Sequence, residues 1–182
     1  MRLAGGIAEI PPDAKGMTWG KRYRDERLEI DMVGCWAGES CGPVRGDTPC
    51  ESSRPLLCVK IDGRTRPPYQ VRDPEHGDDA IFGGWLGGEM AITPPTAGTR
   101  LRSREIADGI CREALGDGWR MAENEDGRYI EGMDSTHAWG ESWDAQTAEI
   151  GAFSFYAHGK VPTNGRFWVA NNDKKANCWD SW

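Results

Sequence analysis

Acidic side chains gather in one short, glycine-containing stretch of the sequence, where they could bind a metal ion. The stretch holds Glu123, Glu125, Asp126, Glu131 and Asp134. Carboxylate oxygens are the ligands that calcium takes, in sets of about six to eight. The stretch lacks the spacing of an EF-hand loop, however, and a solvated acidic loop has the same composition. Both interpretations stay open, with the solvated loop favoured, and a second acidic segment at residues 73–79 has the same two interpretations.

The other reactive side chains do not form a recognisable catalytic set. His76, His137 and His158 are scattered and share no ligand spacing. The sequence has no Gly-x-Ser-x-Gly segment that would present a serine nucleophile. Its glycine-rich residues 83–88 lack the lysine and the following helix of a phosphate-binding loop. We therefore expect a protein that is not an enzyme.

Six cysteines could form structural disulfide bonds: Cys35, Cys41, Cys50, Cys58, Cys111 and Cys178. An even count in a chain with 24 glycines and 11 prolines predicts disulfides and an oxidising compartment. Metal ligation and free thiols are the alternatives, but no Cys-x-x-Cys pair of the kind that zinc sites use is present. The first residues lack the apolar stretch of a secretion signal, so the start is trimmed or misassigned, or the chain is exported by another route, or it is cytoplasmic with reduced thiols; we favour a trimmed or misassigned start.

Tryptophan is the main source of large apolar surface in this chain. Hydrophobic residues make up 38% of the 182 residues, and nine of them are tryptophans. Four tryptophans are candidate anchors at a protein interface, with burial in the core as the alternative for each: Trp139, Trp143, Trp179 and Trp182. The net charge of −7 and the absence of a basic stripe argue against a nucleic-acid partner. No window approaches the roughly 20 apolar residues of a membrane-spanning segment.

One helix is clearly predicted, over residues 103–115. Ser103 is suited to its N-cap and Gly116 to its C-terminal stop. Ile106, Ile110 and Ala114 recur at helical spacing, so we expect this stripe to face the core together with the neighbouring cysteine and leucine.

Short strands are predicted on both sides of this helix, at residues 28–32, 56–61, 81–93, 119–123, 152–157 and 167–170. Residues 1–27 are polar and interrupted by two prolines, which predicts an extended N-terminal arm. Residues 28–182 then form a single disulfide-stabilised domain.

The C-terminal half resembles a known superfamily. A cysteine-bearing helix leads into Gly-Trp-Arg-Met-Ala-Glu at residues 118–123, and Arg-Phe-Trp-Val at 166–169 precedes Asn172-Asp173 and Cys178. Over residues 99–182 this order is similar to the C-type-lectin-like superfamily and the related formylglycine-generating-enzyme-like domains. The resemblance implies a loop-rich α+β fold with one main helix. It also implies a disulfide between Cys111 and Cys178, which leaves Cys35, Cys41, Cys50 and Cys58 to pair among themselves.

The resemblance also bears on ligands. Sugar-binding members of the superfamily hold calcium partly through an Asn-Asp pair, which Asn172 and Asp173 match, although neither a Glu-Pro-Asn nor a Gln-Pro-Asp triplet occurs. The candidate calcium ligands are thus Asn172, Asp173, Glu123, Glu125 and Asp126, and no other cofactor is expected. The formylglycine-generating branch uses two late cysteines, of which only Cys178 has a counterpart here.

The sequence therefore predicts a disulfide-stapled α+β domain that acts through its surface. We expect a non-catalytic, extracytoplasmic binding or accessory subunit that contacts other protein subunits in a larger assembly. The alternative is a lectin-like module that binds a glycan through calcium or through tryptophan stacking.

Overall fold

The computed structural model describes residues 9–35, 41–65, 84–128 and 153–182. Its strands are β1 Lys15–Gly16, β2 Thr18–Asp25, β3 Ile30–Gly34, β4 Thr48–Pro49, β5 Ser53–Arg54, β6 Leu57–Ile61, β7 Gly84–Ile92, β8 Thr96–Ala97, β9 Arg120–Met121, β10 Ser154–His158 and β11 Phe167–Trp168. One α-helix, α1 Arg104–Leu115, and two single turns of 3-10 helix, Gly98–Arg100 and Asp126–Arg128, complete the described elements. None of the described helices is long and apolar enough to cross a membrane.

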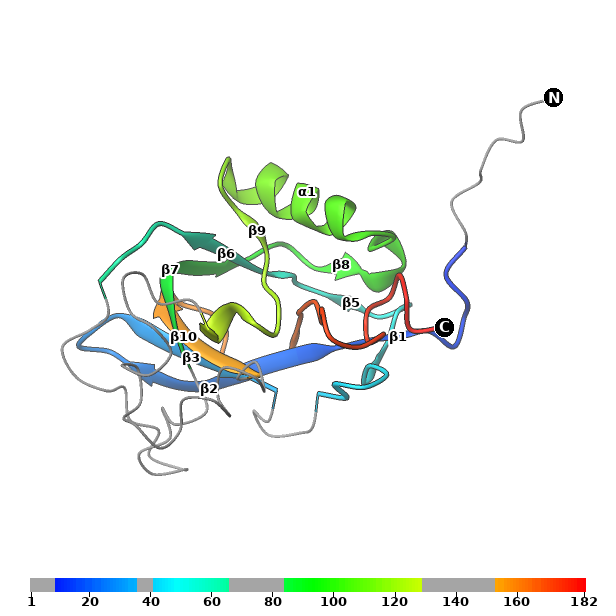
Figure 1. Cartoon of the computed structure of the whole chain (residues 1–182), viewed down its shortest axis with the longest axis horizontal. Helices are drawn as coiled ribbons and strands as arrows, with labels where there is room; N and C mark the ends of the chain where they lie inside the picture. The colour runs from blue at the N-terminus through cyan, green and yellow to red at the C-terminus, as the bar shows by residue number, and fades with distance from the viewer. Residues whose placement is uncertain (1–8, 36–40, 66–83, 129–152) are drawn as a thin grey trace.

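Seven strands form one twisted sheet in the order β11-β2-β3-β10-β7-β6-β9 (Figure 1). All neighbouring pairs are antiparallel except β10 and β7, which are parallel. Strand β10 comes late in the chain but lies at the centre of the sheet, between the N-terminal β3 and the middle strand β7. Helix α1 packs beside β9 at the other end of the sheet from β2. The fold is therefore mixed α+β, with the two halves of the sequence interleaved.

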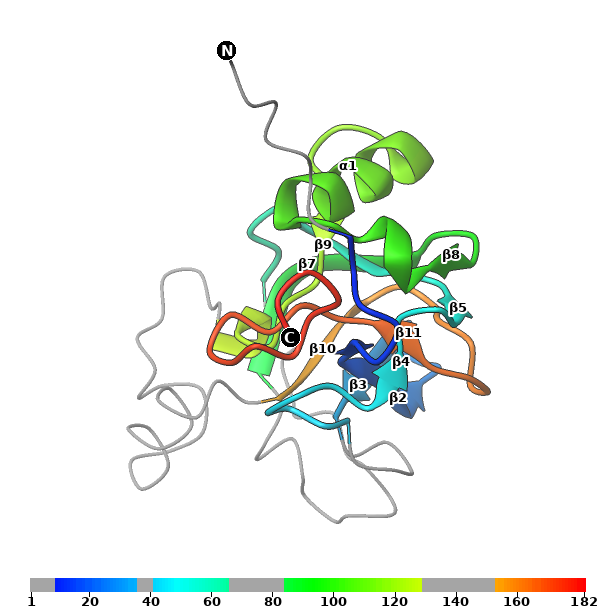
Figure 2. The same ribbon diagram turned by 90° about the vertical axis from the view of Figure 1, so that its right-hand side faces the viewer.

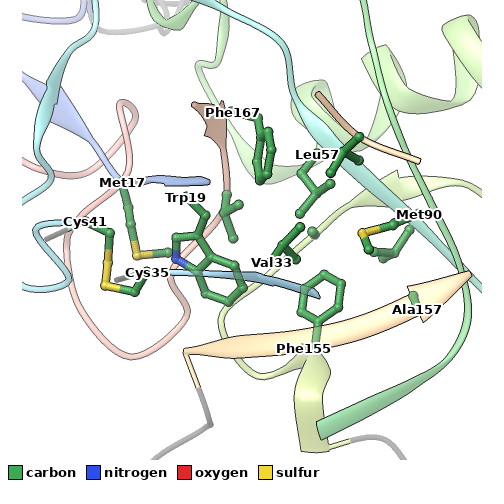
Figure 3. Packing of buried hydrophobic residues seen from close by; sticks show 14 of the residues in the cluster. Met17, Trp19, Val33, Cys35, Cys41, Leu57, Met90, Phe155, Ala157 and Phe167 are labelled. Atoms are coloured by element: carbon green, nitrogen blue, oxygen red, sulfur yellow. A yellow bond between two sulfur atoms is a disulfide. The ribbon is translucent and has the colours of Figure 1, made fainter. Parts of the chain in front are cut away.

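The N-terminal segment departs from our expectation of an arm without a core. Residues 15–16 and 18–25 form β1 and β2, and β2 pairs with both β3 and β11. Met17 and Trp19 are fully buried in the main hydrophobic cluster, where the Trp19 ring lies 5.7 Å from that of Phe155 (Figure 3). Two basic side chains of the segment, Lys21 and Arg24, form ion pairs with the buried Asp31 on β3. Because Asp31 lies outside residues 1–27, the sequence of the segment alone does not reveal this partner.

The predicted helix is confirmed, together with both of its ends. Ser103 Oγ accepts a hydrogen bond from Ile106 N, and Gly116 ends the helix with a φ of 105°. The predicted facing is confirmed in part, because Cys111, Ile110 and Leu115 pack on the hydrophobic cluster beneath the helix, whereas Ile106 and Ala114 are exposed. Ala107 and Cys111 are its buried residues, whereas Ile106 is 39% exposed. A disulfide between Cys111 and the sheet fixes the helix with Cys111 inward, which turns Ile106 toward solvent.

All six cysteines form disulfides, but the pairing differs from the one that the lectin resemblance implies. The bonds join Cys35 to Cys41, Cys50 to Cys178, and Cys58 to Cys111. A Cys111–Cys178 bond is therefore wrong, as is the expectation that the four N-terminal cysteines pair only with one another. Cys58 lies on β6, which pairs with β9, and β9 packs against α1, so that Cys58 is the cysteine brought under the helix.

The C-terminal loop folds back onto the N-terminal strands, and this return sets the Cys50–Cys178 bond. Ser181 Oγ accepts from Lys15 N, and Met17 N donates to Ala176 O. Figure 2 shows this loop between α1 and the strands β4 and β11. A Cβ atom added to Gly98 would lie 2.7 Å from Cys178 Sγ, so the chain needs a glycine where it passes the disulfide.

Candidate functional site

Of the predicted acidic residues, Glu123 and Asp126 belong to one polar network at the N-terminal end of α1, and Glu131 and Asp134 lie outside the described residues. Arg104, in the first turn of the helix, reaches across to the segment after β9 and to the C-terminal loop. Its guanidinium contacts Asp108 at 3.0 Å, Glu123 at 2.8 Å and Asn172 at 3.3 Å. One arginine thus connects three segments that are far apart in the sequence.

A second arginine neutralises the most buried carboxylate of the network. Arg120 on β9 holds Asp126 through both of its terminal nitrogens, at 2.6 and 3.2 Å. Asp126 Oδ2 also accepts from Glu123 N at 2.8 Å. The Asp126 side chain is 3% exposed, and two charge-assisted bonds in this geometry are the usual way to keep a buried carboxylate satisfied.

Asparagines join this network to the C-terminal loop. Asn124 Oδ1 accepts from Asn172 N, and Asn124 Nδ2 donates to Asp173 Oδ2 at 2.8 Å. Asn171 Oδ1 accepts from the backbone of Asp173, and Asn177 in turn exchanges hydrogen bonds with the backbone of Asn171. We did not predict these asparagines except Asn172. The signal in the sequence was their clustering, with four of the five asparagines of the chain taking part in this bracing.

The structure brings together four of the five candidate calcium ligands, Asn172, Asp173, Glu123 and Asp126. The fifth, Glu125, lies in the same turn but none of the contacts above involves it. The positive charges beside these oxygens belong to two arginines. In the described ranges no group of three or more acidic, histidine or cysteine side chains is arranged to hold a metal ion. Two fixed guanidinium groups among the oxygens do not fit a calcium ligand set, so we derive no calcium chemistry from this network.

The charges of the network set the protonation of Glu123. Burial raises the pKa of Glu123, but a hydrogen bond with Asn172 and the charges of Arg104 and Arg120 outweigh that effect. The pKa of Glu123 therefore lies below its ordinary value. For Asp126, burial is the largest effect and raises the pKa above its ordinary value in spite of Arg120.

We expect Glu123→Gln to lower the free energy of unfolding by about 1 kcal/mol at neutral pH, because it removes the charge that faces Arg104. A carboxylate with a lowered pKa in the folded state contributes stability above its unfolded pKa and loses it as the pH falls through the folded pKa. The difference between wild type and variant should therefore disappear in acid. Urea unfolding at neutral pH and at a pH well below 4.5, the ordinary value of a glutamate, measures it. A difference that persists unchanged in acid would contradict the assignment.

An open groove of about 280 Å³ lies between α1 and the segment of residues 93–100. It is lined by Thr93, Pro94, Pro95, Thr96, Arg100, Ile110, Glu113 and Ala114. Its lining mixes apolar side chains with threonines, an arginine on the segment before α1 and a glutamate on α1 itself. The groove was not predicted, because it forms where the segment around β8 passes α1.

The predicted interface tryptophans have different environments. Trp182 is 53% exposed, whereas Trp179 is partly buried against the hydrophobic cluster beneath α1. Trp139 and Trp143 lie outside the described residues, as do His76 and His137.

His158 packs edge-on against Trp85, at a ring distance of 5.4 Å, and its pKa is lowered chiefly by burial.

Comparison with known proteins does not place this chain in a family. No family model, no characterised protein and no solved structure matches it.

Proposed function

We propose that this protein is a non-catalytic, extracytoplasmic accessory subunit that binds a partner protein with the outer face of α1. One observation carries the proposal. Ile106, Ile110 and Ala114 form an apolar stripe along the helix that the core covers only in part, since Ile110 packs against the cluster beneath α1 and the other two are exposed. Ile106 is 39% exposed, Ala114 is exposed, and Ile110 and Ala114 line the groove.

The setting of this stripe supports a contact role. Two disulfides with long sequence separations, Cys58–Cys111 and Cys50–Cys178, lie in the cluster directly beneath α1. A helix fixed in this way loses little conformational entropy on binding, which favours affinity. An apolar stripe with polar and charged side chains at its edges has the composition of an interface centre and rim.

The disulfides also support the proposed location. Three disulfides that use all six cysteines fit a protein that folds in an oxidising compartment. The C-type-lectin-like fold is part of the proposal only as the source of the competing sugar-binding function, because the disulfide that this resemblance implies is not formed.

Ile106→Glu tests the proposal, with Val44→Glu as its matched control. Val44 is 59% exposed on a different segment, so the two variants add the same charge to comparable apolar surface. In extracts of the cells that produce the protein, the wild-type chain should migrate in native separations well above its own 20.2 kDa. Ile106→Glu should weaken that association at least about tenfold, because burial of an isoleucine is worth about 1.5–3 kcal/mol. Val44→Glu should leave it intact. Migration of the wild type as a monomer, or an equal loss of association in both variants, would rule the proposal out.

Glycan binding is the competing proposal, and the exposed ring of Trp182 favours it, since sugars stack on such rings. A glycan array with wild type and Trp182→Ala, with and without a chelator, separates the two functions. Binding that is lost in Trp182→Ala but not in Ile106→Glu would support the sugar-binding module. Absence of binding under both conditions would leave the protein-contact role.

A further inference from the structure

The turn that leads into β11 carries a pair of residues with a reactivity of its own. Residues 162–165 are all exposed, and they include Asn164 followed by Gly165. This is the one Asn-Gly pair in the 182 residues. Gly165 has a φ of 93°, and no heavy atom lies within 4 Å of the place where a Cβ would stand. The turn therefore gives both solvent and the asparagine side chain free access to the Gly165 amide.

We propose that Asn164 is a site of spontaneous deamidation, with water as the only co-reactant. The Gly165 backbone nitrogen attacks Asn164 Cγ and forms a new C–N bond in a five-membered succinimide ring. The bond from Cγ to the side-chain nitrogen breaks, and that nitrogen leaves as ammonia with the proton that the Gly165 nitrogen has lost. Water then opens the ring at either carbonyl. The product is aspartate, or isoaspartate with the backbone routed through the former side chain.

The other asparagines of the chain are protected by their surroundings. Asn124, Asn171 and Asn177 are buried, and each uses its side-chain amide in hydrogen bonds. Asn172 is exposed, but its side-chain oxygen accepts from Arg104. In addition, each of the four precedes a residue with a side chain, which hinders attack by the following nitrogen. They are internal controls within the same molecule.

Three of the four Asp-Gly pairs, which could undergo related ring closure, are restrained, and the fourth, Asp117-Gly118, is exposed but has no amide leaving group. Gly63 N donates to Gly87 O, so the nitrogen after Asp62 is engaged in a hydrogen bond. Asp108 and Gly109 lie within α1, and Asp126 is buried against Arg120. Among the described residues with a following glycine, Asn164 thus combines the amide leaving group with an unhindered turn.

The modification changes the charge of the surface near a fixed cation. It adds one negative charge to a chain of net charge −7. The new carboxylate stands two residues before Arg166, whose guanidinium donates to Thr18 Oγ1 at 2.8 Å and to Cys35 O. On the other side of the turn, Val161 N is bound to Asp31. Because both ends of the turn are anchored, we expect the change to stay confined to residues 162–165.

Incubation of the purified, folded protein in mildly alkaline buffer at physiological temperature tests the proposal. Trypsin releases residues 161–166 as one peptide, so mass spectrometry can follow the conversion of amide to acid, and chromatography separates aspartate from isoaspartate. A sample digested at time zero corrects for conversion during digestion. We expect most of the chains to be converted at Asn164 within weeks, faster at higher pH, while the other four asparagines keep their amides.

Two further samples make the outcome decisive. Asn164→Gln should abolish the conversion, because a glutamine would need a less favourable six-membered ring. The isolated peptide of residues 161–166 reports the rate without the fold. Retention of the Asn164 amide in the folded protein, over a time in which the free peptide loses its amide, would overturn the proposal.

Discussion

Asp31→Asn is expected to lower the free energy of unfolding by about 3–5 kcal/mol, because it removes the only buried carboxylate that the described residues show on two nearly buried cations. Asp31 lies on β3 and is 0% exposed. Its carboxylate contacts Lys21 Nζ at 3.1 Å and Arg24 Nη1 at 2.9 Å, and it accepts from Val161 N at 2.7 Å. The side chains of Lys21 and Arg24 are themselves only 7% and 14% exposed, so water cannot replace the lost charge.

The matched control for this prediction is Glu26→Gln. Glu26 contacts the same arginine at 2.9 Å, but its side chain is 76% exposed, so its loss should leave stability unchanged within error. Urea or guanidinium unfolding of the three proteins at neutral pH measures the difference. A stability of Asp31→Asn equal to that of Glu26→Gln would show that the buried ion cluster does not hold β2 against β3.

Removal of the Cys50–Cys178 bond by a double alanine substitution is expected to lower the free energy of unfolding by about 5 kcal/mol. This is the largest effect expected among the three disulfides. The bond closes a loop with a sequence separation of 128, and the loss of unfolded-state entropy grows with loop length. The Cys35–Cys41 bond has a separation of 6, for which the same relation gives about 2 kcal/mol.

The variant in which both Cys35 and Cys41 are replaced by alanine is therefore the control. Both pairs are fully or almost fully buried, so the packing change is similar and the loop length differs. Chemical unfolding under non-reducing conditions gives the two values, and peptide mapping of the wild type establishes the pairing itself. Equal losses in both variants would mean that loop closure does not account for the stabilisation. A mapped Cys111–Cys178 bond would restore the lectin-type arrangement.

Local patterns in the sequence were sufficient to predict the elements whose formation depends on neighbouring residues. The Ser103 N-cap, the Gly116 stop and the 12 residues of α1 were predicted because capping and helical periodicity act within a few residues. Strand β6 was predicted for the same reason, since its apolar run ends in a turn that the sequence marks with Asp62-Gly63. The participation of the cysteines in disulfides followed from their even number in a turn-rich chain.

The candidate site could be predicted only in part. Four of the acidic and amide side chains proposed as ligands do come together, but their partners are Arg104, Arg120 and Asn124. The residues next to Arg104 on the helix and next to Arg120 on the short strand do not indicate that these two arginines face neighbouring carboxylates. The brace formed by Asn124, Asn171 and Asn177 was missed because the Asn124 bonds depend on how the C-terminal loop returns to the segment after β9, and the Asn171–Asn177 bonds depend on the conformation of the loop itself.

The amino-acid sequence by itself determined that this protein has one well-capped helix, short strands, an aromatic core and cross-linked cysteines, because each of these depends on composition or on neighbouring residues. Only the tertiary structure decided the rest: that β10 enters the sheet between β3 and β7, that β2 belongs to the sheet, and that Cys111 pairs with Cys58. The physical reason is that these features are contacts between distant segments. A buried carboxylate such as Asp31 lets a polar segment join the core sheet, and a disulfide can fix a helix so that a residue expected inside, Ile106, is exposed.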